Sequence, residues 1–232
     1  QYAENKFFGK PCGLMDQVAC AVGGIVAIDF KDPSAPVIEK VDFDISGAGY
    51  NLCIVNTGGN HADLNDDYAS VPAEMKAIAK KMGKSVLREV NEEDVIAAIP
   101  ALREKVGDRA ILRAFHFADE CVRVEKAVKA LREDDIEAFF AAEIASGESS
   151  WKLLQNLYVA NSDNQEMPLA LEMSRRMLEG RGAWRIHGGG FAGTVQAFVP
   201  FDLLDSFRAG IDGVLGQGAC HVLSIRPQGG VE

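Results

Sequence analysis

Residues 185–199 read RIHGGGFAGTVQAFV, and they decide which fold the chain can have. Gly188, Gly190 and Gly193 formally match GxGxxG, the phosphate-binding pattern of dinucleotide-binding proteins, which requires a helix directly after the loop. The loop is followed instead by TVQAFV, a β-branched and alternating run that predicts a strand. A dinucleotide-binding fold is therefore not expected.

The glycine loop, residues 188–193, has two interpretations that the residues alone leave open. It is a structural hairpin or bulge between two strands, or it is a loop whose backbone approaches a phosphate or a substrate. Glycines permit positive φ and close approach, and successive backbone N–H groups can bind an anion. We therefore treat the loop as a candidate binding site.

Outward from the glycine loop, strand patterns flank a long helical block. Strands are predicted over 24–30, 37–43, 50–56, 183–187, 194–200 and 220–226. Helices are predicted over 14–22, 70–83, about 108–131, from Asp134 or Asp135, and over 149–159, 168–179 and 201–216. The helix of 70–83 is expected to be capped by Ser70, with Pro72 in its first turn. This order predicts an α+β fold with helices packed on one face of an antiparallel sheet.

Composition excludes several classes of protein. The chain has 232 residues, 47% of them hydrophobic, and its 24 Lys+Arg against 34 Asp+Glu give a net charge of −10. These fractions are typical of an ordinary globular protein, and the acidity argues against binding to a nucleic-acid backbone. No apolar run reaches the roughly 20 residues that span a bilayer, and QYAENKFFGK at the start contains no apolar signal region. Neither nucleic acid nor membrane is an expected partner.

Cysteine and histidine usage predicts no metal site. The five cysteines are widely spaced without a CxxC pair, which argues against a disulfide framework and a structural zinc site. We expect buried thiols in a reducing compartment, and hence a cytoplasmic location. The four histidines are scattered and form no HExxH pair, so each is expected to be structural.

Asp16, in the segment KPCGLMDQ (10–17), is a second candidate functional residue. It falls in the first turn of the predicted helix after Gly13, where the helix dipole favours an ionised carboxylate. Such a carboxylate could accept a proton from an attacking hydroxyl. It could equally do no more than stabilise the start of its own helix, and the residues alone do not decide between the two.

Together the two motifs resemble those of a known family. PCGLMDQ, followed near the end of the chain by RIHGGGFAGTVQAFV, is similar to the GHMP small-molecule kinases, and among them to the galactokinases. Intermediate segments agree in order and spacing, namely NTGGNHADLNDDYASVPAEMKAIAKKMG (56–83), SVLREV (85–90) and RAFHFADECVRV (113–124). The resemblance covers nearly the whole chain.

The resemblance implies phosphorylation of the anomeric C1 hydroxyl of galactose, dependent on ATP and Mg²⁺, to give galactose 1-phosphate. Asp16 matches the catalytic aspartate that takes or polarises the proton of that hydroxyl, and Gly13 and Tyr68 match sugar-contacting positions. The glycine loop matches the family motif that supports the nucleotide phosphates, through Gly188, Gly189, Gly190 and Gly193. Sugar and ATP are thus the implied ligands.

The chain also departs from the family pattern. His187 stands where Thr or Ser is usual, and Ala192 stands where Gly is usual, so that a positive φ at Ala192 would cost about 1 kcal/mol. The family's Gly-Leu-Ser-Ser-Ser phosphate loop does not occur in these residues, and its Mg²⁺ ligands are expected upstream. The resemblance therefore implies a C-terminal portion, with residues 1–46 as a remnant of the N-terminal domain and 47–232 as the C-terminal domain. We expect this chain to be inactive on its own.

Two alternatives to a galactose kinase stay open. One is a kinase for a related sugar or amino sugar, because the specificity residues of the family lie mostly upstream. The other is a non-catalytic sensor that binds sugar and nucleotide without turnover, which the residues His187 and Ala192 motivate.

Overall fold

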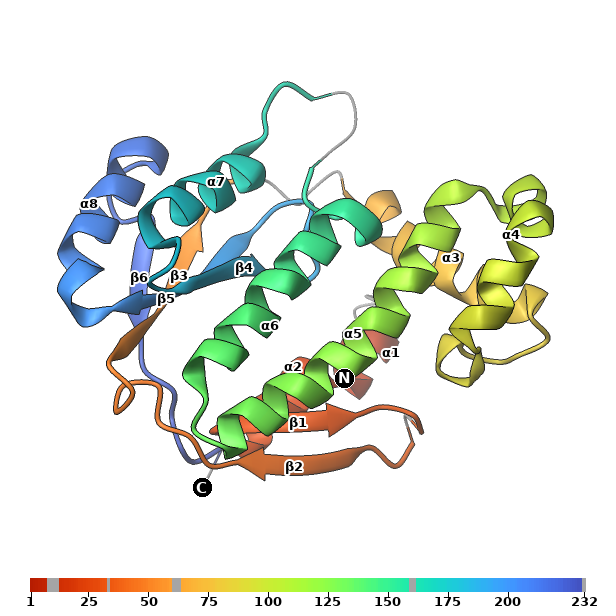
Figure 1. The fold of residues 1–232 in the computed structure, drawn as a ribbon, viewed down its shortest axis with the longest axis horizontal. Coiled ribbons are helices and arrows are strands. Elements are labelled where there is room, and N and C mark those ends of the chain that lie inside the picture. The colour runs from red at the N-terminus through yellow and green to blue at the C-terminus, as the bar shows by residue number, and fades with distance from the viewer. Residues whose placement is uncertain (8–12, 33, 60–63, 159–161, 231–232) are drawn as a thin grey trace.

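The computed structural model describes residues 1–232 apart from 8–12, 33, 60–63, 159–161 and 231–232 (Figure 1). The helices are α1 (Tyr2–Lys6), α2 (Met15–Val22), α3 (Asn65–Lys81), α4 (Glu92–Val106), α5 (Asp108–Arg132), α6 (Ile136–Ser149), α7 (Glu166–Leu178) and α8 (Leu204–Leu215). Short helical turns are η1 (Leu87–Glu89), the π-helix η2 (Ser150–Leu154) and η3 (Phe201–Leu203). The strands are β1 (Ile25–Asp29), β2 (Val37–Val41), β3 (Tyr50–Asn56), β4 (Ala183–His187), β5 (Thr194–Pro200) and β6 (Cys220–Leu223). Among these described helices, none is both long and apolar enough to cross a membrane.

The strands form two antiparallel sheets. The larger sheet has the order β4-β5-β3-β6, and β1 and β2 form a separate two-stranded sheet. In the larger sheet β3 and β5 pair along their whole lengths, with Cys53 opposite Ala197. The predicted α+β class with an antiparallel sheet is therefore confirmed.

One face of the larger sheet is covered by α7 and α8, as Figure 1 shows. Successive side chains on a strand point to opposite faces, and Val195, Ala197 and Val199 of β5 all belong to the buried cluster on the α7 and α8 side. Phe207 and Ile211 of α8 are fully buried against the same cluster. The alternation in TVQAFVP thus supplies the main core of the protein.

Phe198 of β5 belongs to a second buried cluster. Its ring packs edge-on against Phe139 of α6, with ring centroids 5.4 Å apart, and it also contacts Phe140. Val41 of β2 joins this cluster, so the pair β1–β2 is attached to the rest of the fold through apolar contacts. An ion pair between Arg132 of α5 and Glu39 of β2 supports the same attachment.

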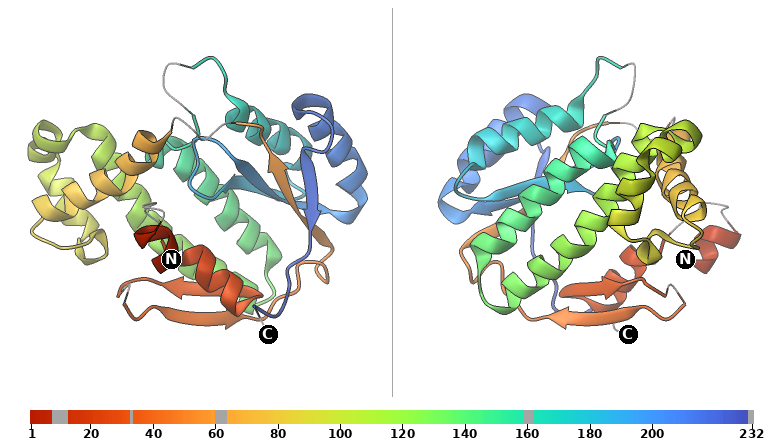
Figure 2. Two further views of the ribbon diagram at one scale, coloured as in Figure 1. Left: turned by 180° about the vertical axis from the view of Figure 1, so that it is seen from behind. Right: turned by 45° about the vertical axis from the view of Figure 1, so that its right-hand side comes forward.

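The helices α3 and α4 and the N-terminal part of α5 form their own packing unit, which projects beyond the sheet at one end of the molecule, whereas the rest of α5 runs beside α6 (Figure 2). Its buried side chains include Ile78 of α3, Leu102 of α4 and Ile111 of α5. The apolar stripe that predicted a helix over 70–83 is the side of α3 that faces this core. This unit fixes α3 relative to α5, which matters for the candidate site.

The start of α3 differs from the prediction. The helix begins at Asn65, so Ser70 is no cap and Pro72 lies inside the helix. An interior proline removes one helical hydrogen bond and is normally costly. The additional turn is stabilised because Tyr68 packs against a small cluster formed by Leu64, Phe191 and Ala192.

Other differences lie at segment ends and in two helices. The helix predicted over 149–159 ends at Leu154, because Gln155 takes a left-handed conformation with φ 57°. The last strand ends at Leu223. The helices α1 and α4 were not predicted. In α4 the Asn91 side chain is the cap, because it accepts a hydrogen bond from the Glu93 N–H.

Candidate functional site

The glycine loop connects β4 to β5, as the sequence predicted. Gly188, Gly190 and Gly193 have φ values of 80°, 88° and 111°. Side chains rarely tolerate this region, so the three glycines are required by the path of the backbone. Phe191 also has a positive φ, 58°, and its buried ring offsets the strain.

The loop is held by its carbonyl oxygens. The Tyr68 hydroxyl donates to Gly190 O at 2.6 Å, and the Asn156 amide Nδ2 donates to Gly189 O at 3.1 Å. Thr57 donates twice to Gly193 O, from its backbone N–H at 3.0 Å and from its hydroxyl at 2.7 Å. The Phe191 N–H also donates to the backbone carbonyl oxygen of Asn156. Three separate segments therefore fix the loop: the residue after β3, the helix α3 and the turn after η2.

Because the carbonyl oxygens of the loop face its supports, two backbone donors are left at the surface. Gly188 and Gly189 are exposed, and their N–H groups donate no hydrogen bond to another residue in the described ranges. Successive backbone N–H groups of this kind form an anion-binding concavity. The geometry therefore favours the binding interpretation of the loop, with an anionic ligand.

The support is also too close for side chains on two of the glycines. A Cβ at Gly190 would lie 2.2 Å from the carbonyl oxygen of Asn156, and one at Gly189 would lie 2.8 Å from Cε1 of Tyr68. At Gly188 nothing lies within 4 Å of a Cβ. Gly189 and Gly190 are thus required by packing, whereas Gly188 is required only by its φ.

Tyr68 supports the loop directly. Its ring packs edge-on against Phe191 at a centroid separation of 5.4 Å. Burial raises the pKa of its phenol. The family resemblance implies a sugar contact for Tyr68, and in the structure its hydroxyl donates to the loop carbonyl of Gly190.

The two departures from the family pattern have different surroundings. Ala192 is buried and does not take a positive φ, so the strain considered for it falls on Phe191 instead. Its Cβ approaches Gly59 so closely that a Cβ at Gly59 would lie 3.0 Å away. His187 is exposed at the end of β4.

Asp16 lies where the sequence placed it, in the first turn of α2, and its side chain is exposed. Gly13 precedes the helix and is exposed as well, and a Cβ at this position would have no atom within 4 Å. Among the described residues no hydrogen bond or ion pair joins Asp16 to the glycine loop. The structure therefore brings Tyr68 to the loop but does not bring Asp16 into contact with it.

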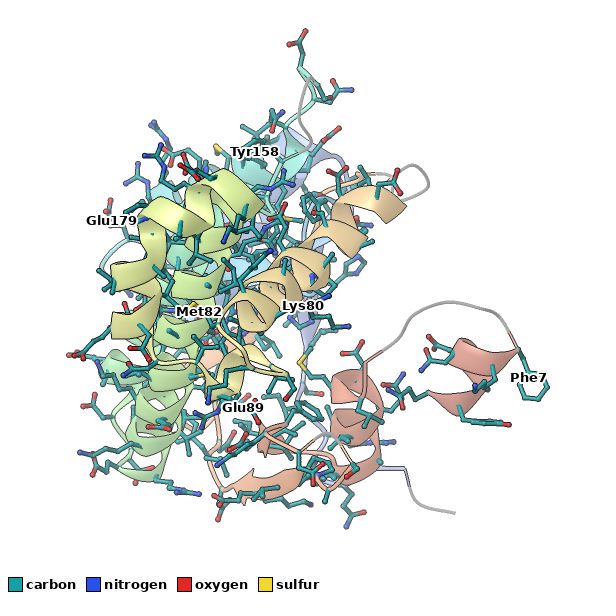
Figure 3. The ribbon with its side chains drawn as sticks, turned by 90° about the vertical axis from the view of Figure 1, so that its right-hand side faces the viewer. Phe7, Lys80, Met82, Glu89, Tyr158 and Glu179 are labelled. Carbon is teal, nitrogen blue, oxygen red and sulfur yellow. The ribbon has the colours of Figure 1, made fainter. Side chains whose placement is uncertain are left out.

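Figure 3 shows α1, whose end is marked by Phe7, standing away from the rest of the chain.

The sequence did not reveal three residues that shape the loop. Thr57 and Asn156 are buried and polar. Thr57 lies in the segment 56–83 that resembles the family, but nothing in the sequence marks either residue as a contact of the glycine loop. Arg113 is 1% exposed and connects the segments that hold the loop. An arginine between Ile111 and Ala114, in a part of α5 whose neighbouring residues are buried, is a signal that could have indicated it.

No metal site was predicted from the cysteines and histidines, and in the described ranges no group of three or more His, Cys, Asp or Glu could hold a metal ion. The expectation of buried thiols holds for Cys53 and Cys220, whereas Cys20 is exposed. Cys12 and His61 lie outside the described residues.

Comparisons with curated proteins give galactokinases. The chain is 29% identical to the galactokinase of Glaesserella parasuis over 212 residues, which are 90% of this chain and 52% of that protein. It is 30% identical to the galactokinase of Thermotoga neapolitana over 193 residues, 83% of this chain and 50% of that protein. No family model matches the chain.

Comparisons with solved structures agree on the fold. The galactokinase of Lactococcus lactis complexed with galactose matches 99% of this chain and 58% of its own, with a TM-score of 0.77 and 24% identity. The mevalonate kinase of L. major in complex with R-mevalonate matches 93% of this chain and 53% of its own, with a TM-score of 0.55 and 14% identity. The chain is thus similar in sequence to galactokinases and shares the fold of GHMP kinases, and it spans about half the length of the curated relatives it matches.

Proposed function

We propose that the chain is part of a sugar kinase of galactokinase type, which transfers a phosphoryl group from ATP to the C1 hydroxyl of galactose and forms galactose 1-phosphate. One observation carries the proposal: the glycine loop is held by its carbonyl oxygens and leaves the N–H groups of Gly188 and Gly189 exposed. Galactose is proposed as the substrate because the chain is similar to galactokinases.

The loop's part in this reaction is electrostatic. Phosphoryl transfer depends on positioning and on neutralising the charge of the phosphate oxygens more than on covalent chemistry. Backbone N–H groups that are already oriented need no rearrangement during the reaction. Gly188 and Gly189 would donate to phosphate oxygens, while Gly190 and Gly193 hold the loop through their carbonyls.

Asp16 is the proposed catalytic residue. It is a carboxylate in the first turn of α2, exposed and thus accessible to a substrate. A carboxylate within hydrogen-bond reach of the sugar C1 hydroxyl can take its proton or orient it for attack. Gly13 would let the sugar approach the backbone, and Tyr68 would border it with its ring, because its hydroxyl proton is already donated to Gly190.

The remaining assignments rest on the family relationship. ATP and Mg²⁺ are the proposed cofactors, with the metal ligands outside the described part of this chain. Residues 1–46 are proposed to be a remnant of the N-terminal domain, and residues 47–232 the C-terminal domain. The separate pairing of β1 with β2 supports this division. We also propose a cytoplasmic location.

The test is a phosphoryl-transfer assay with ATP, Mg²⁺ and a panel of galactose, related sugars and amino sugars. It is run on the protein at its natural full length and, in parallel, on the 232-residue chain. We expect galactose turnover at about 1–100 per second for the former and none for the latter. Asp16→Asn should reduce turnover by about 10²–10⁴-fold. Asp205→Asn, which changes the equivalent first-turn carboxylate of α8, is the matched control and should retain full turnover.

Each other outcome has a definite meaning. Preference for another sugar would replace galactose by that sugar and keep the kinase. Binding of both sugar and ATP without turnover would identify a non-catalytic sensor. Full turnover by Asp16→Asn would overturn the role of Asp16, and turnover by the 232-residue chain would overturn the expectation that it is inactive alone.

A further inference from the structure

Arg113 of α5 is a buried cation behind the glycine loop. Its side chain is 1% exposed, and its guanidinium makes three hydrogen bonds. Nε donates to the carbonyl oxygen of Leu154 at 3.0 Å, and Nη1 donates at 2.9 Å to the hydroxyl of Ser70 and at 2.9 Å to Oε2 of Glu74. Burial lowers the pKa of Arg113, and the charge of Glu74 opposes this shift.

The three acceptors lie on α3 and at the end of η2, next to the two side chains that donate to the carbonyl oxygens of Gly190 and Gly189. Ser70 and Glu74 are on α3, and Ser70 lies two residues after Tyr68, which donates to Gly190. Leu154 is the last residue of η2 and lies two residues before Asn156, which donates to Gly189. The Arg113 guanidinium therefore joins the segment that carries Tyr68 to the segment that carries Asn156, and we call these two segments the Tyr68 support and the Asn156 support.

The support at Asn156 needs such a connection. Its side chain is held by one hydrogen bond, and its Oδ1 is buried without a partner among the described residues. The residue before it, Gln155, has a left-handed backbone that is strained for a side chain. The Gln155 N–H is bonded within η2, to the Ser150 carbonyl, whereas the Leu154 carbonyl accepts from Arg113 and so joins this turn to α5.

We propose that Arg113 is a positioning residue of the glycine loop, which sets the spacing between the Tyr68 and Asn156 supports and thereby the orientation of the Gly188 and Gly189 amides. The consequence for ligand binding rests on the proposed function, since it assumes that these amides bind a phosphate. The guanidinium is suited to this task because its donors have a fixed planar geometry. A lysine ammonium would keep the charge beside Glu74 but could not hold the same three acceptors.

The alternative is that Arg113 has a purely structural role and only links α5 to α3. Arg109 already provides that link, because Nε and Nη2 of Arg109 bind the same Glu74 carboxylate, at 3.0 Å and 2.5 Å from Oε1. Arg109 is half exposed and makes no hydrogen bond to η2 in the described part of the chain. The bond to Leu154 thus distinguishes Arg113 from Arg109, and Arg109→Lys is the matched control for Arg113→Lys.

The experiment measures amide hydrogen exchange in the 232-residue chain without ligand. The Phe191 N–H donates to Asn156 and reports on the Asn156 support, whereas the Thr57 N–H donates to Gly193 and reports on the β3 support. In Arg113→Lys we expect exchange at Phe191 to accelerate at least about tenfold relative to Thr57, the effect of losing one hydrogen bond to a charged group. In Arg109→Lys both rates should stay at their wild-type values.

A measurement on the wild-type chain serves if Arg113→Lys fails to fold. The Arg113 Nε–H should give a slowly exchanging arginine signal in a nitrogen–proton NMR spectrum, because it is buried and donates to Leu154. Rapid exchange of every arginine Nε–H would overturn the proposal. Unchanged exchange at Phe191 in a folded Arg113→Lys chain would overturn it as well.

A second arm adds ATP as the probe and separates this proposal from the proposed function. If wild type binds ATP, Arg113→Lys should weaken the affinity at least about fivefold and Arg109→Lys should leave it unchanged. If wild type binds no ATP but Phe191 exchange responds as expected, the positioning role stands and the phosphate contact fails. If ATP binds equally to all three proteins and Phe191 is unaffected, the phosphate contact stands and the positioning role fails.

Discussion

The hydroxyl of Tyr68 donates a 2.6 Å hydrogen bond to the carbonyl oxygen of Gly190, a residue 122 positions later in the chain. This bond joins the start of α3 to the connection between β4 and β5. It also turns the Gly190 carbonyl toward the protein, as the bonds from Asn156 and Thr57 do for Gly189 and Gly193. The hydrogen-bond donors that remain exposed on the loop are the backbone N–H groups of Gly188 and Gly189.

Tyr68→Phe should therefore loosen the loop without removing the packing of the ring. Gly190 O would keep the 2.7 Å bond from the Ala192 N–H, so the expected loss in free energy of unfolding is about 1 kcal/mol. Urea unfolding measures it. Tyr158→Phe, at a tyrosine that is 40% exposed, is the control and should change stability by less than about 0.5 kcal/mol. Equal losses in both variants would contradict the assigned bond.

Gly190→Ala should be much more damaging than Gly188→Ala. Both residues have a positive φ, so each substitution carries a conformational cost of about 1 kcal/mol. Only at Gly190 would the new Cβ meet a backbone atom, Asn156 O at 2.2 Å, whereas the space at Gly188 is open. We expect Gly190→Ala to cost at least about 2 kcal/mol more in urea unfolding. Equal costs would mean that φ alone requires these glycines.

Thr57→Val tests the third support of the loop. Thr57 is buried, and valine has nearly its shape, so the substitution mainly removes the 2.7 Å bond from the hydroxyl to Gly193 O. The backbone bond at 3.0 Å remains, and the expected loss in unfolding free energy is about 1 kcal/mol. Thr57→Ser keeps the hydroxyl and should recover part of this loss. A serine variant less stable than the valine variant would show that the methyl group matters more than the bond.

His116 should make the fold sensitive to mild acid. Its ring is buried and its Nδ1 lies 2.9 Å from the Ser149 hydroxyl, and burial lowers its pKa, with Glu120 opposing and Arg123 reinforcing the shift. A histidine with a lowered folded pKa contributes fully above its unfolded value of about 6.5, and this contribution is lost as the pH falls toward the folded pKa.

Thermal unfolding at about pH 7.5 and about pH 5.5 checks this expectation. The melting temperature of the wild type should fall between the two conditions, and that of His116→Gln should fall less. His221→Gln, at an exposed histidine, is the control and should follow the wild type. An identical fall in His116→Gln would assign the acid sensitivity to other groups.

Several features could be predicted from the sequence because they depend on short windows. The alternation in TVQAFVP set which side chains of β5 enter the core. The glycine requirement at 188–193 was also visible, since no other residue adopts that backbone freely. The relation to the GHMP kinases followed from the order of motifs along the chain.

The start of α3 could not be predicted, because local signals pointed to Ser70 and Pro72 as its beginning. The helix instead starts at Asn65, where Leu64 and Tyr68 pack against Phe191 and Ala192. These contacts join residues far apart in the sequence, and their burial outweighs the cost of an interior proline.

The sequence by itself thus determined the α+β class, the strands on either side of the glycine loop and the need for glycine there. Only the tertiary structure decided what holds the loop, namely Tyr68, Asn156 and Thr57, and which cation lies behind them, Arg113. The reason is physical: backbone propensities and periodicity act between neighbours, whereas these hydrogen bonds span 33 to 136 positions and exist only once the core has packed.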